Sequence, residues 1–374
     1  MKLLMSDTSG FVCEAWLASA GMTSAQLRSL ISAFGSASSC YEAFLRKDPD
    51  MEALISPRIR QVLEQNASGE KLRVFRLLME KHRISVIRKN DALYPESLKN
   101  LDDPPAFLFF RGNPECLNNR LVSMVGSRAA SYTGQKAARK LAEGLSRHGV
   151  TVVSGLASGI DACAHLGCLE GGSATVAVTG CGLDRVYPAD NAALHERILA
   201  ENGLILSEYA PGEKPAGWHF PVRNRIITGL SRALILVEAK IRSGSMTSVR
   251  HALEQGKDVF VYPGDPDSEY FEGNRQLLRE GGIFFTGAED ILEDLHWLDN
   301  PSAVRQNSDC SKEVTASSPE EAAVIVALKP GALGFEQLLT KTGLDPSALM
   351  STLTIMQIKG QAEALPGKIY QLRH

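Results

Sequence analysis

Seven short apolar runs, separated by helical stretches, constrain the fold of this chain more than any other feature of its sequence. The runs are LVSMV (121–125), VTVVS (150–154), ATVAVT (174–179), LILSE (204–208), ALILVEA (233–239), DVFVYPG (258–264) and IFFT (283–286). They are apolar at successive positions, as strands buried on both faces of a parallel sheet must be. The alternation predicts an α/β domain over residues 84–298, with a doubly wound, mostly parallel sheet and right-handed crossovers. Glycine or serine commonly follows these runs, at the sheet edge where such folds bind ligands.

The segment before this domain, residues 1–83, consists of short amphipathic helical stretches. Ser24 and Ser56 are the expected N-caps of two of these helices. We therefore expect a small helical domain at residues 1–83.

The segments after residue 298 have two different patterns. Residues 299–318 are polar and without a period, which indicates a linker. Residues 319–374 predict three helices and then a hairpin, with Thr342-Gly343 and Asp345-Pro346 at a helix-turn-helix corner. This order indicates a winged-helix module.

The composition excludes some classes of protein. A net charge of −3 over 374 residues excludes a polybasic chain, although a local basic patch could still bind a polyanion. No run reaches the roughly 18 apolar residues of a membrane span, and the N-terminus lacks the apolar stretch and cleavage site of a signal peptide. Seven cysteines at irregular spacing do not form a disulfide framework. We expect a protein of the reducing cytoplasm, with no membrane partner.

The turn after the first run, MVGSRAASYTG (124–134), carries candidate phosphate ligands. Gly126 stands where a dinucleotide fingerprint has its first glycine, but the second and third glycines are missing, which argues against NAD or FAD. Gly126, Ser127, Arg128 and Ser131 remain at the expected N-terminus of a helix. They offer N–H groups, hydroxyls and a guanidinium to a phosphate. A capped helix with a surface arginine explains the same residues equally well.

The second turn, SGLASGIDACAH (154–165), offers Ser154, Gly155 and Ser158 to an anion or to the following helix as caps. On the same predicted helix, three ionisable residues recur at i, i+4 and i+7, namely Asp161, His165 and Cys168. This spacing could describe metal ligands or an acid–base pair, but zinc sites normally show paired ligand motifs. We interpret these groups as hydrogen-bonded under the turn, and we expect no metal.

Two further turns are expected at the same edge of the sheet. Ser243, Gly244 and Ser245 open a helix directly after the run ALILVEA, where they could bind an anion or simply cap the helix. The segment GCGLDRVYP (180–188) is glycine-rich and is expected to shape the cleft.

The segment FPVRNRIITGLS (220–231) places Arg223, Asn224 and Arg225 at the mouth of the sheet. Arginine is a forked, permanently charged donor suited to phosphate, and asparagine both donates and accepts. A salt-bridged loop is the alternative. Several anion sites along one edge fit a chain of phosphates better than a single nucleotide. Phe220, and near it Trp218 and Tyr209, could stack on bases, although Phe220 could equally be a core residue.

Five segments in this order resemble the DNA-processing protein A (DprA/Smf) family over about residues 107–285. They are VGSRAASYTG, SGLASGIDACAH, GCGLDRVYPADN, FPVRNRIITGLS and LVEAKIRSGSMTSVRHALEQGKDVFVYPG. The resemblance implies an extended Rossmann-like domain, usually with a small helical domain before it and often a winged helix after it. It also implies a homodimer that binds single-stranded DNA and helps to load a RecA-type recombinase during natural transformation. No enzymatic activity and no cofactor are implied.

The resemblance also implies which residues contact DNA. The Gly-Ser-Arg turn of the family falls on residues 126–128, and its phosphate-facing arginines fall on Arg223 and Arg225. Many members have a lysine where this chain has Gly217, and Lys214 is the nearest candidate to replace it. The full set of candidate DNA contacts is Gly126, Ser127, Arg128, Ser131, Ser154, Gly155, Ser158, Lys214, Phe220, Arg223, Asn224, Arg225, Ser243, Gly244 and Ser245.

Two other functions compete with single-strand binding. Related Rossmann-like enzymes of the cytokinin-activating LOG and lysine-decarboxylase-like group hydrolyse nucleotide monophosphates, and they carry a Pro-Gly-Gly-x-Gly-Thr turn. Here Pro263-Gly264 is followed by Asp265-Pro266 instead. The third candidate is a scaffold whose winged helix binds duplex DNA or a protein, but five acids balance five bases from Pro319 onward, which disfavours duplex binding.

Overall fold

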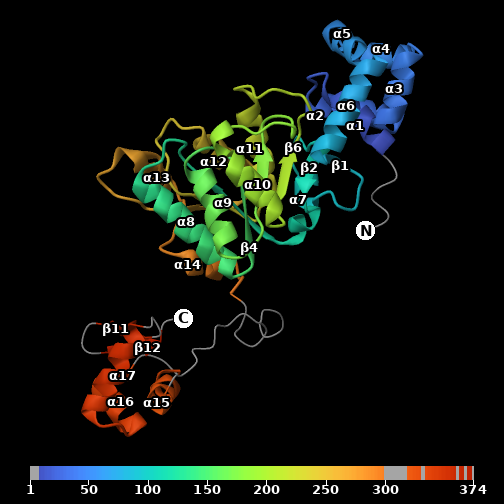
Figure 1. Cartoon of the computed structure of the whole chain (residues 1–374). Helices are drawn as coiled ribbons and strands as arrows, with labels where there is room; N and C mark the ends of the chain where they lie inside the picture. Colours follow the sequence, from blue (N-terminus) through green and yellow to red (C-terminus); the bar gives the residue numbers. More distant parts are fainter. Residues whose placement is uncertain (1–7, 299–317, 330–332, 359–361, 366–368, 373–374) are drawn as a thin grey trace. The chain divides into compact units, whose positions relative to one another are not determined.

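The computed structural model describes residues 8–298, 318–329, 333–358, 362–365 and 369–372 (Figure 1). Contacts divide the chain into two compact units, Met1–Leu298 and Asp299–His374. The predicted linker lies outside the described residues apart from Ser318. A boundary at residue 83 within the first unit stays a prediction. None of the helices described is long and apolar enough to cross a bilayer.

A nine-stranded sheet forms the centre of the first unit, in the order β1-β2-β6-β5-β4-β3-β7-β8-β9. The strands are β1 (Ser85–Arg88), β2 (Phe107–Gly112), β3 (Arg120–Val125), β4 (Val150–Ser154), β5 (Val176–Thr179), β6 (Leu204–Ser207), β7 (Ala233–Leu236), β8 (Asp258–Val261) and β9 (Ile283–Phe284). Neighbours among β3 to β9 are all parallel. The seven predicted runs supply these seven strands, and β4 to β7 are buried along their whole length. The predicted doubly wound α/β fold is confirmed.

Two strands at one end of the sheet were not predicted. β2 pairs antiparallel with β6, and β1 pairs antiparallel with β2. Phe107 to Phe110 are all buried in β2. This four-residue apolar run could have identified β2, whereas β1 is too short and too polar at its ends to stand out.

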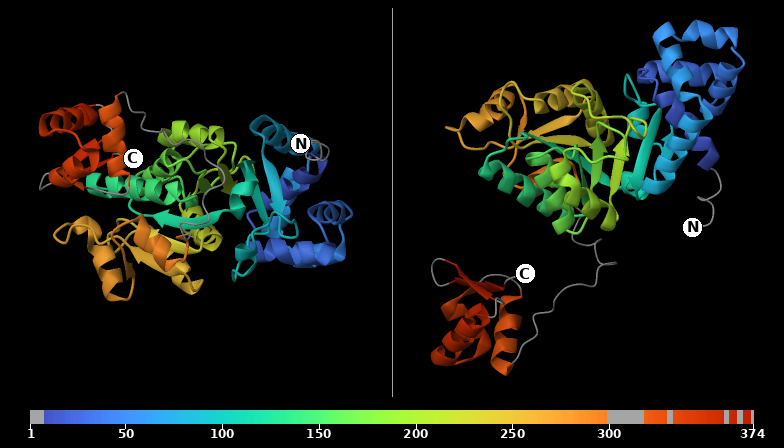
Figure 2. Two further views of the ribbon diagram at one scale, coloured as in Figure 1. Left: turned by 90° about the horizontal axis from the view of Figure 1, so that it is seen from below. Right: turned by 45° about the horizontal axis from the view of Figure 1, so that its top comes forward.

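Helices cover both faces of the sheet, as a parallel sheet requires (Figures 1 and 2). On one face α8 (Tyr132–Arg147), α9 (Ile160–Glu170) and α14 (Ala288–Asp294) pack on β3, β4, β7 and β8. On the other face lie α7 (Glu96–Lys99), α11 (His219–Leu230), α12 (Ser245–Glu254) and α13 (Glu272–Arg279). The remaining elements of this region are α10 (Ala192–Ala200), η1 (Pro114–Asn118), η2 (Ala189–Asn191) and η3 (Glu269–Phe271).

Residues 220–230 lie in the helix α11, whereas the alternative interpretation from the sequence was a salt-bridged loop. Ile226, Ile227 and Leu230 are buried in the core that α11 shares with α7, α12 and the sheet. Burial of these three side chains therefore stabilises the segment as a helix. The arginines and the asparagine of the motif are consequently presented by a rigid helix.

Between residue 8 and the sheet lie six helices: α1 (Thr8–Ala18), α2 (Ser24–Phe34), α3 (Ala37–Leu45), α4 (Pro49–Leu54), α5 (Pro57–Asn66) and α6 (Gly69–His82). Ser56 caps α5 as predicted, but Thr23 caps α2 and forms a capping box with Gln26, while Ser24 is the first helical residue. The side chain of Trp16 lies at the centre of these helices. Their core continues into Phe109 of β2 and Ile205 of β6, so the helices pack directly on this end of the sheet (Figure 2).

The second unit has the predicted helix and hairpin order. Its helices are α15 (Pro319–Leu328), α16 (Phe335–Thr342) and α17 (Pro346–Ile358), and its sheet has the order β10-β12-β11, from β10 (Leu333–Gly334), β11 (Ala362–Leu365) and β12 (Ile369–Leu372). Gly343 ends α16 in a left-handed conformation, with φ of 67°, and Pro346 begins α17. These residues form the predicted corner, and the winged-helix module is confirmed.

Candidate functional site

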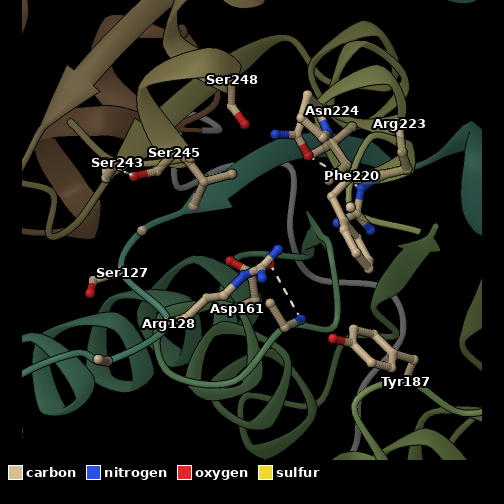
Figure 3. Close-up of a pocket in the computed structure, with 18 of the residues that line it drawn as sticks. Ser127, Arg128, Asp161, Tyr187, Phe220, Arg223, Asn224, Ser243, Ser245 and Ser248 are labelled. Atoms are coloured by element: carbon tan, nitrogen blue, oxygen red, sulfur yellow. Dashed lines mark hydrogen bonds between the residues drawn. The ribbon is translucent and has the colours of Figure 1, made fainter. Parts of the chain in front are cut away.

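The strand order reverses between β3 and β7, and a cavity opens at that point. Chains leaving β3 and β7 diverge to helices on opposite faces, which leaves a crevice beyond the carboxyl ends of the strands. The cavity has a volume of about 600 Å³. Figure 3 shows side chains of α11 and α12 on one side of it, and those of the turns after β3 and β5 on the other.

Most of the predicted contacts line this cavity or a small one of about 100 Å³ that shares Arg128, Phe220 and Arg223 with it. The predicted residues in the larger cavity are Gly126, Ser127, Arg128, Phe220, Arg223, Asn224, Ser243, Gly244 and Ser245. Gly155 and Ser158 line the smaller one. The structure thus brings together four segments that are up to 119 residues apart in the sequence, from Gly126 to Ser245.

The turn that carries Arg128 is held in place by two backbone hydrogen bonds. Ser127 donates its N–H to the carbonyl oxygen of Glu238 at 2.8 Å, and Ile160 donates to that of Ser127 at 3.1 Å. Gly159 has φ of 79°, and a Cβ there would collide with the Ser127 carbonyl oxygen, so this close approach requires glycine. The turn is rigid, whereas the Arg128 side chain itself is exposed.

Two aromatic rings and two guanidinium groups meet around Phe220 in the cavity. Phe220 stacks on Tyr187 with the ring centroids 5.4 Å apart, and the guanidinium of Arg128 lies 5.0 Å from the Phe220 centroid (Figure 3). Arg223 lies 6.0 Å from the same ring. Phe220 is half-buried and Tyr187 is 42% exposed, so the stack borders the cavity and is not part of the core. Cations over ring faces are attracted by the ring quadrupole, which positions both arginines.

Arg223 is a buried cation at the base of the cavity. Its Nη1 donates to the carbonyl oxygens of Gly155, at 2.9 Å, and Val178, and its Nε donates to Oδ1 of Asn224 at 3.2 Å. Burial lowers the pKa of Arg223 to about 10, so the side chain stays charged at neutral pH. Burial also raises the pKa of Asp161, although the nearby Arg223 opposes this shift.

Glycine at position 155 is required by these side chains. A Cβ there would lie 2.6 Å from Nη2 of Arg223 and 2.7 Å from Oδ2 of Asp161. Asp161 accepts hydrogen bonds from the N–H groups of Gly155, at 3.1 Å, and Ala157, at 3.4 Å. The carboxylate therefore shapes the turn, as the sequence predicted, and it also lines the cavity.

Hydroxyl groups also line the cavity, at the start of α12. The hydroxyls of Ser243 and Ser245 lie 2.7 Å apart, and Ser248 lines the cavity one turn further along the helix. The N-cap residue of α12 is Gly244, and no side chain caps the helix. The cavity therefore combines cations, aromatic rings, hydroxyls and a helix N-terminus without a side-chain cap, a set suited to an anionic ligand that carries flat rings.

Four predicted contacts lie outside both cavities. Ser154 is buried and donates to the carbonyl oxygen of Met124 at 2.6 Å. Lys214 is exposed and does not line the cavity, although its neighbours Pro215 and Gly217 do. The other two, Arg225 and Ser131, have different structural roles.

Arg225 faces away from the cavity. Its Nη2 forms an ion pair with Oε1 of Glu208 at 2.7 Å and donates to the Ser24 hydroxyl at 3.0 Å, and its Nε donates to the carbonyl oxygen of Asp103 at 3.0 Å. Arg223 and Arg225 were both expected to face one groove. This expectation is wrong for Arg225, which faces away from the cavity. Residues two apart on a helix point to different sides, and here one side meets α2 and β6.

Ser131 caps α8, and a buried carboxylate already occupies that helix N-terminus. The hydroxyl of Ser131 accepts from the N–H of Gly134 at 3.0 Å, while its own N–H donates to the carboxylate of Glu238 at 3.0 Å. Glu238 is fully buried at the end of β7. The free N–H groups predicted here for a phosphate are therefore partly satisfied by Glu238, a residue that the sequence did not single out.

His165 and Cys168 bond within the fold, in agreement with their interpretation as architectural groups. Nδ1 of His165 lies 2.7 Å from the Thr175 hydroxyl, and the Cys168 sulfur accepts from the N–H of Val152 at 3.4 Å. Both side chains are fully buried. Neither lines the cavity.

Tyr187 and Ser248 also line the cavity, although the sequence did not indicate either of them as a ligand contact. Tyr187 lies in a turn that was expected only to shape the cleft, and its partner Phe220 is 33 residues away. Ser248 lies one helical turn beyond Ser245, and this spacing could have identified it.

Comparisons with known proteins place the site in a family context. Residues 85–296 match the family model of the DNA recombination-mediator protein A, and residues 311–368 match that of the DprA winged helix domain. The chain is 44% identical over 207 residues to the DNA processing protein DprA of Streptococcus pneumoniae, covering 55% of this chain and 73% of that protein. It is 33% identical over 299 residues to the protein Smf of Escherichia coli, covering 79% of each chain.

Two solved structures resemble the chain. The X-ray structure of DprA from Streptococcus pneumoniae has a TM-score of 0.64 and 35% identity, covering 75% of this chain and 95% of that one. The other is described as giving insights into the unique single-stranded DNA binding mode of DprA from Helicobacter pylori. It has a TM-score of 0.52 and 30% identity, covering 57% of this chain and 96% of that one.

Proposed function

The chain belongs to the DNA recombination-mediator protein A family, and from this premise we propose that it binds single-stranded DNA in the cavity between β3 and β7. This membership confirms the resemblance found in the sequence. The observation that carries the proposal is the arrangement of Arg128, Phe220, Tyr187 and Arg223 around one cavity at the edge of the sheet. Guanidinium groups next to stacked rings match the alternation of phosphate and base along a strand.

The same arrangement favours a single strand over a duplex. The rings of Phe220 and Tyr187 border a cavity of about 600 Å³, where the face of an unpaired base can meet them. Bases of a duplex are stacked on one another and present edges, whereas a flexible strand presents faces. We therefore expect binding that depends on phosphates and stacking, with little dependence on base sequence.

A titration of the purified protein tests this proposal. Labelled single-stranded and duplex oligonucleotides of the same sequence are titrated at two salt concentrations. We expect tighter binding of the single strand and weaker binding at the higher salt concentration, because phosphate contacts release counterions. The variant Arg128→Ala should bind less tightly and show a salt slope smaller by about one unit. Equal affinity for both forms at matched salt would contradict the proposal.

We further propose that the bound strand is passed to a RecA-type recombinase and that the protein acts as a homodimer in the cytoplasm, in recombination or natural transformation. These three points rest on family membership. Light scattering tests the dimer. Recombinase loading is tested by the rate at which a RecA-type recombinase assembles on strands pre-coated with this protein. No acceleration over naked strands would contradict the loading role.

We propose that the protein is not an enzyme. The competing function, hydrolysis of nucleotide monophosphates, needs an acid or base that reaches the ligand. Asp161 is already engaged by the N–H groups of Gly155 and Ala157, and His165 is buried outside the cavity lining. Incubation with the four ribonucleoside monophosphates should release no base. Turnover that is lost in Asp161→Asn while the fold is retained would favour the enzyme.

A further inference from the structure

We infer that the exposed face of α8 continues the binding site, so that a single strand leaves the cavity at Arg128 and runs along Tyr132, Lys136 and Lys140. We call these three residues the α8 track. This inference rests on the proposed function and extends it beyond the cavity.

The first observation is an exposed aromatic ring without a partner. Tyr132 is 82% exposed, the highest value among the large apolar side chains described, and it makes no ring contact within the described residues. It is the first residue of α8, four positions after Arg128. An exposed ring next to a cation-lined cavity is the arrangement on which unpaired bases stack in single-strand binders.

The second observation is a pair of lysines on the same face of the helix. Lys136 and Lys140 follow Tyr132 at i+4 and i+8 and are exposed. None of the ion pairs between described residues involves either lysine, whereas Arg139 is paired with Glu170 and Arg147 with Glu143. A cation that is already held in an ion pair attracts a phosphate less strongly. Lys136 and Lys140 are therefore the cations of α8 that remain available to bind a phosphate.

The spacing of the track suits an extended strand. Four residues of an α-helix advance about 6 Å along its axis, which is comparable to the phosphate repeat of an extended strand. Tyr132, Lys136 and Lys140 thus form a regular series along α8, which begins four residues after Arg128 of the cavity. Since α8 follows the turn that carries Arg128 at the cavity, the helix leads away from the cavity (Figure 1), and all three side chains of the track are exposed.

The track has a defined end. The acidic helix α14 packs on α8 at Gly144, where a glycine Cβ would lie 3.0 Å from the Cβ of Ala288. The first turn of α14 carries Glu289 and Asp290. Carboxylates repel a phosphate chain, so the strand should leave α8 after Lys140.

The experiment compares two double variants of the full chain that have the same net charge, Lys136→Ala/Lys140→Ala and the control Arg147→Ala/Arg279→Ala. Arg279 is exposed at the end of α13, and neither control residue belongs to the proposed site. Each protein is titrated with labelled oligothymidines of about 4 and about 16 nucleotides, which bracket the site sizes of single-strand grooves. The shorter strand can fill only the cavity, whereas the longer one can also reach α8.

We expect the lysine variant to bind the longer strand about tenfold less tightly, with a salt slope smaller by roughly one to two units, and to bind the shorter strand as the native protein does. Tyr132→Ala should lower the affinity for the longer strand by a similar factor. Tyr132→Phe should not lower it, because stacking needs the ring and not the hydroxyl. The control variant should behave as the native protein does.

Three results would overturn the α8 track. One is equal weakening in the control variant, which would indicate diffuse charge. Another is unchanged affinity of the lysine variant for the longer strand. The third is a loss of affinity for the longer strand in the variant Lys214→Ala/Trp218→Ala but not in the lysine variant. This result would indicate that the strand leaves the cavity past Lys214 and Trp218. A native protein that binds neither strand would instead refute the proposed function itself.

Discussion

Arg223 and Asp161 bind the two backbone polar groups of one residue, Gly155. The guanidinium donates to the carbonyl oxygen of Gly155 at 2.9 Å, and the carboxylate accepts from its N–H at 3.1 Å. Opposite charges are thereby held close together at the base of the cavity without a direct ion pair between them. The cavity thus has a structural cation, Arg223, and an exposed one, Arg128, and the two should respond differently to mutation.

Arg223→Ala should destabilise the protein, whereas Arg128→Ala should not. Removing the Arg223 side chain leaves the carbonyl oxygens of Gly155 and Val178 without this donor and the Asp161 carboxylate without its neighbouring charge. We expect a loss of about 3 kcal/mol in the free energy of unfolding. Arg128→Ala changes an exposed side chain and should cost less than about 0.5 kcal/mol.

Urea denaturation of both variants, alongside strand titration, checks this contrast. Both should lose affinity for single-stranded DNA. An Arg223→Ala variant as stable as the native protein would mean that the buried hydrogen bonds contribute little, and that the arginine serves binding alone.

Arg225→Ala should destabilise the fold without changing the affinity of the folded protein for single-stranded DNA. The variant leaves Glu208 without its ion pair at 2.7 Å and removes the donor to Ser24, which links α11 to α2. A loss of about 3 kcal/mol is expected, because the remaining carboxylate is only 10% exposed. A strand affinity reduced as much as that of Arg128→Ala would show that Arg225 contacts DNA after all.

A double-mutant cycle with Glu208→Ala isolates the pair. The second substitution should cost less in the Arg225→Ala background than alone, since the buried carboxylate is then no longer left unpaired. Additive losses would indicate that the two side chains stabilise the fold independently.

His165 should make the protein less stable as the pH falls below about 6.5. Burial, with a contribution from the Arg223 charge, lowers the pKa of His165 to about 3. The unfolded chain takes up a proton near the ordinary pKa of about 6.5, while the folded chain does not, so the stability present above that pH is lost on acidification. By pH 5.5 the loss should be about 1 kcal/mol.

The measurement is the free energy of unfolding at pH 7 and pH 5.5 for the native protein and for His165→Asn. Whatever the stability of the variant at pH 7, it should change less between the two pH values than that of the native protein. An identical change in both proteins would assign the pH dependence to other groups.

A fragment of residues 1–298 should fold and retain the affinity for single-stranded DNA, whereas a fragment of residues 84–298 should be unstable. The first contains every residue that lines the cavity. The second removes α1 to α6, whose core includes Phe109 and Ile205 of the sheet. The shorter fragment, although it contains every DNA contact expected from the sequence, would expose that apolar surface. Calorimetric unfolding of both fragments checks this, and equal melting temperatures would contradict it.

Much of the fold could be predicted from the sequence because it depends on local patterns. Strands buried on both faces are apolar at most successive positions, and β3 to β9 lie within the runs that carry this pattern, to within a few residues. The C-terminal module could also be predicted from the sequence, since Gly343 and Pro346 mark a helix end and a helix start. β1 escaped prediction because a four-residue edge strand carries too little of any pattern.

The candidate site was likewise predictable only in part. The glycine- and serine-rich turns were predictable because parallel strands bring their carboxyl ends to one edge, so Gly126, Gly155 and Ser243 had to lie near one another. Tyr187 was not predictable as the partner of Phe220, because stacking between residues 33 apart depends on how two loops pack. Glu238 at the N-terminus of α8 is another such contact, made across 107 residues.

The sequence alone therefore determined the layers, the edge at which ligands can bind and the chemical character of that edge, since these follow from hydrophobic pattern and turn chemistry. Only the tertiary structure decided which side chains face the cavity. Arg223 and Arg225 have the same chemistry and lie two residues apart, but successive residues of an α-helix are rotated by about 100°, so the two point to different sides. The packing of α11 turns Arg223 to the cavity and Arg225 to Glu208.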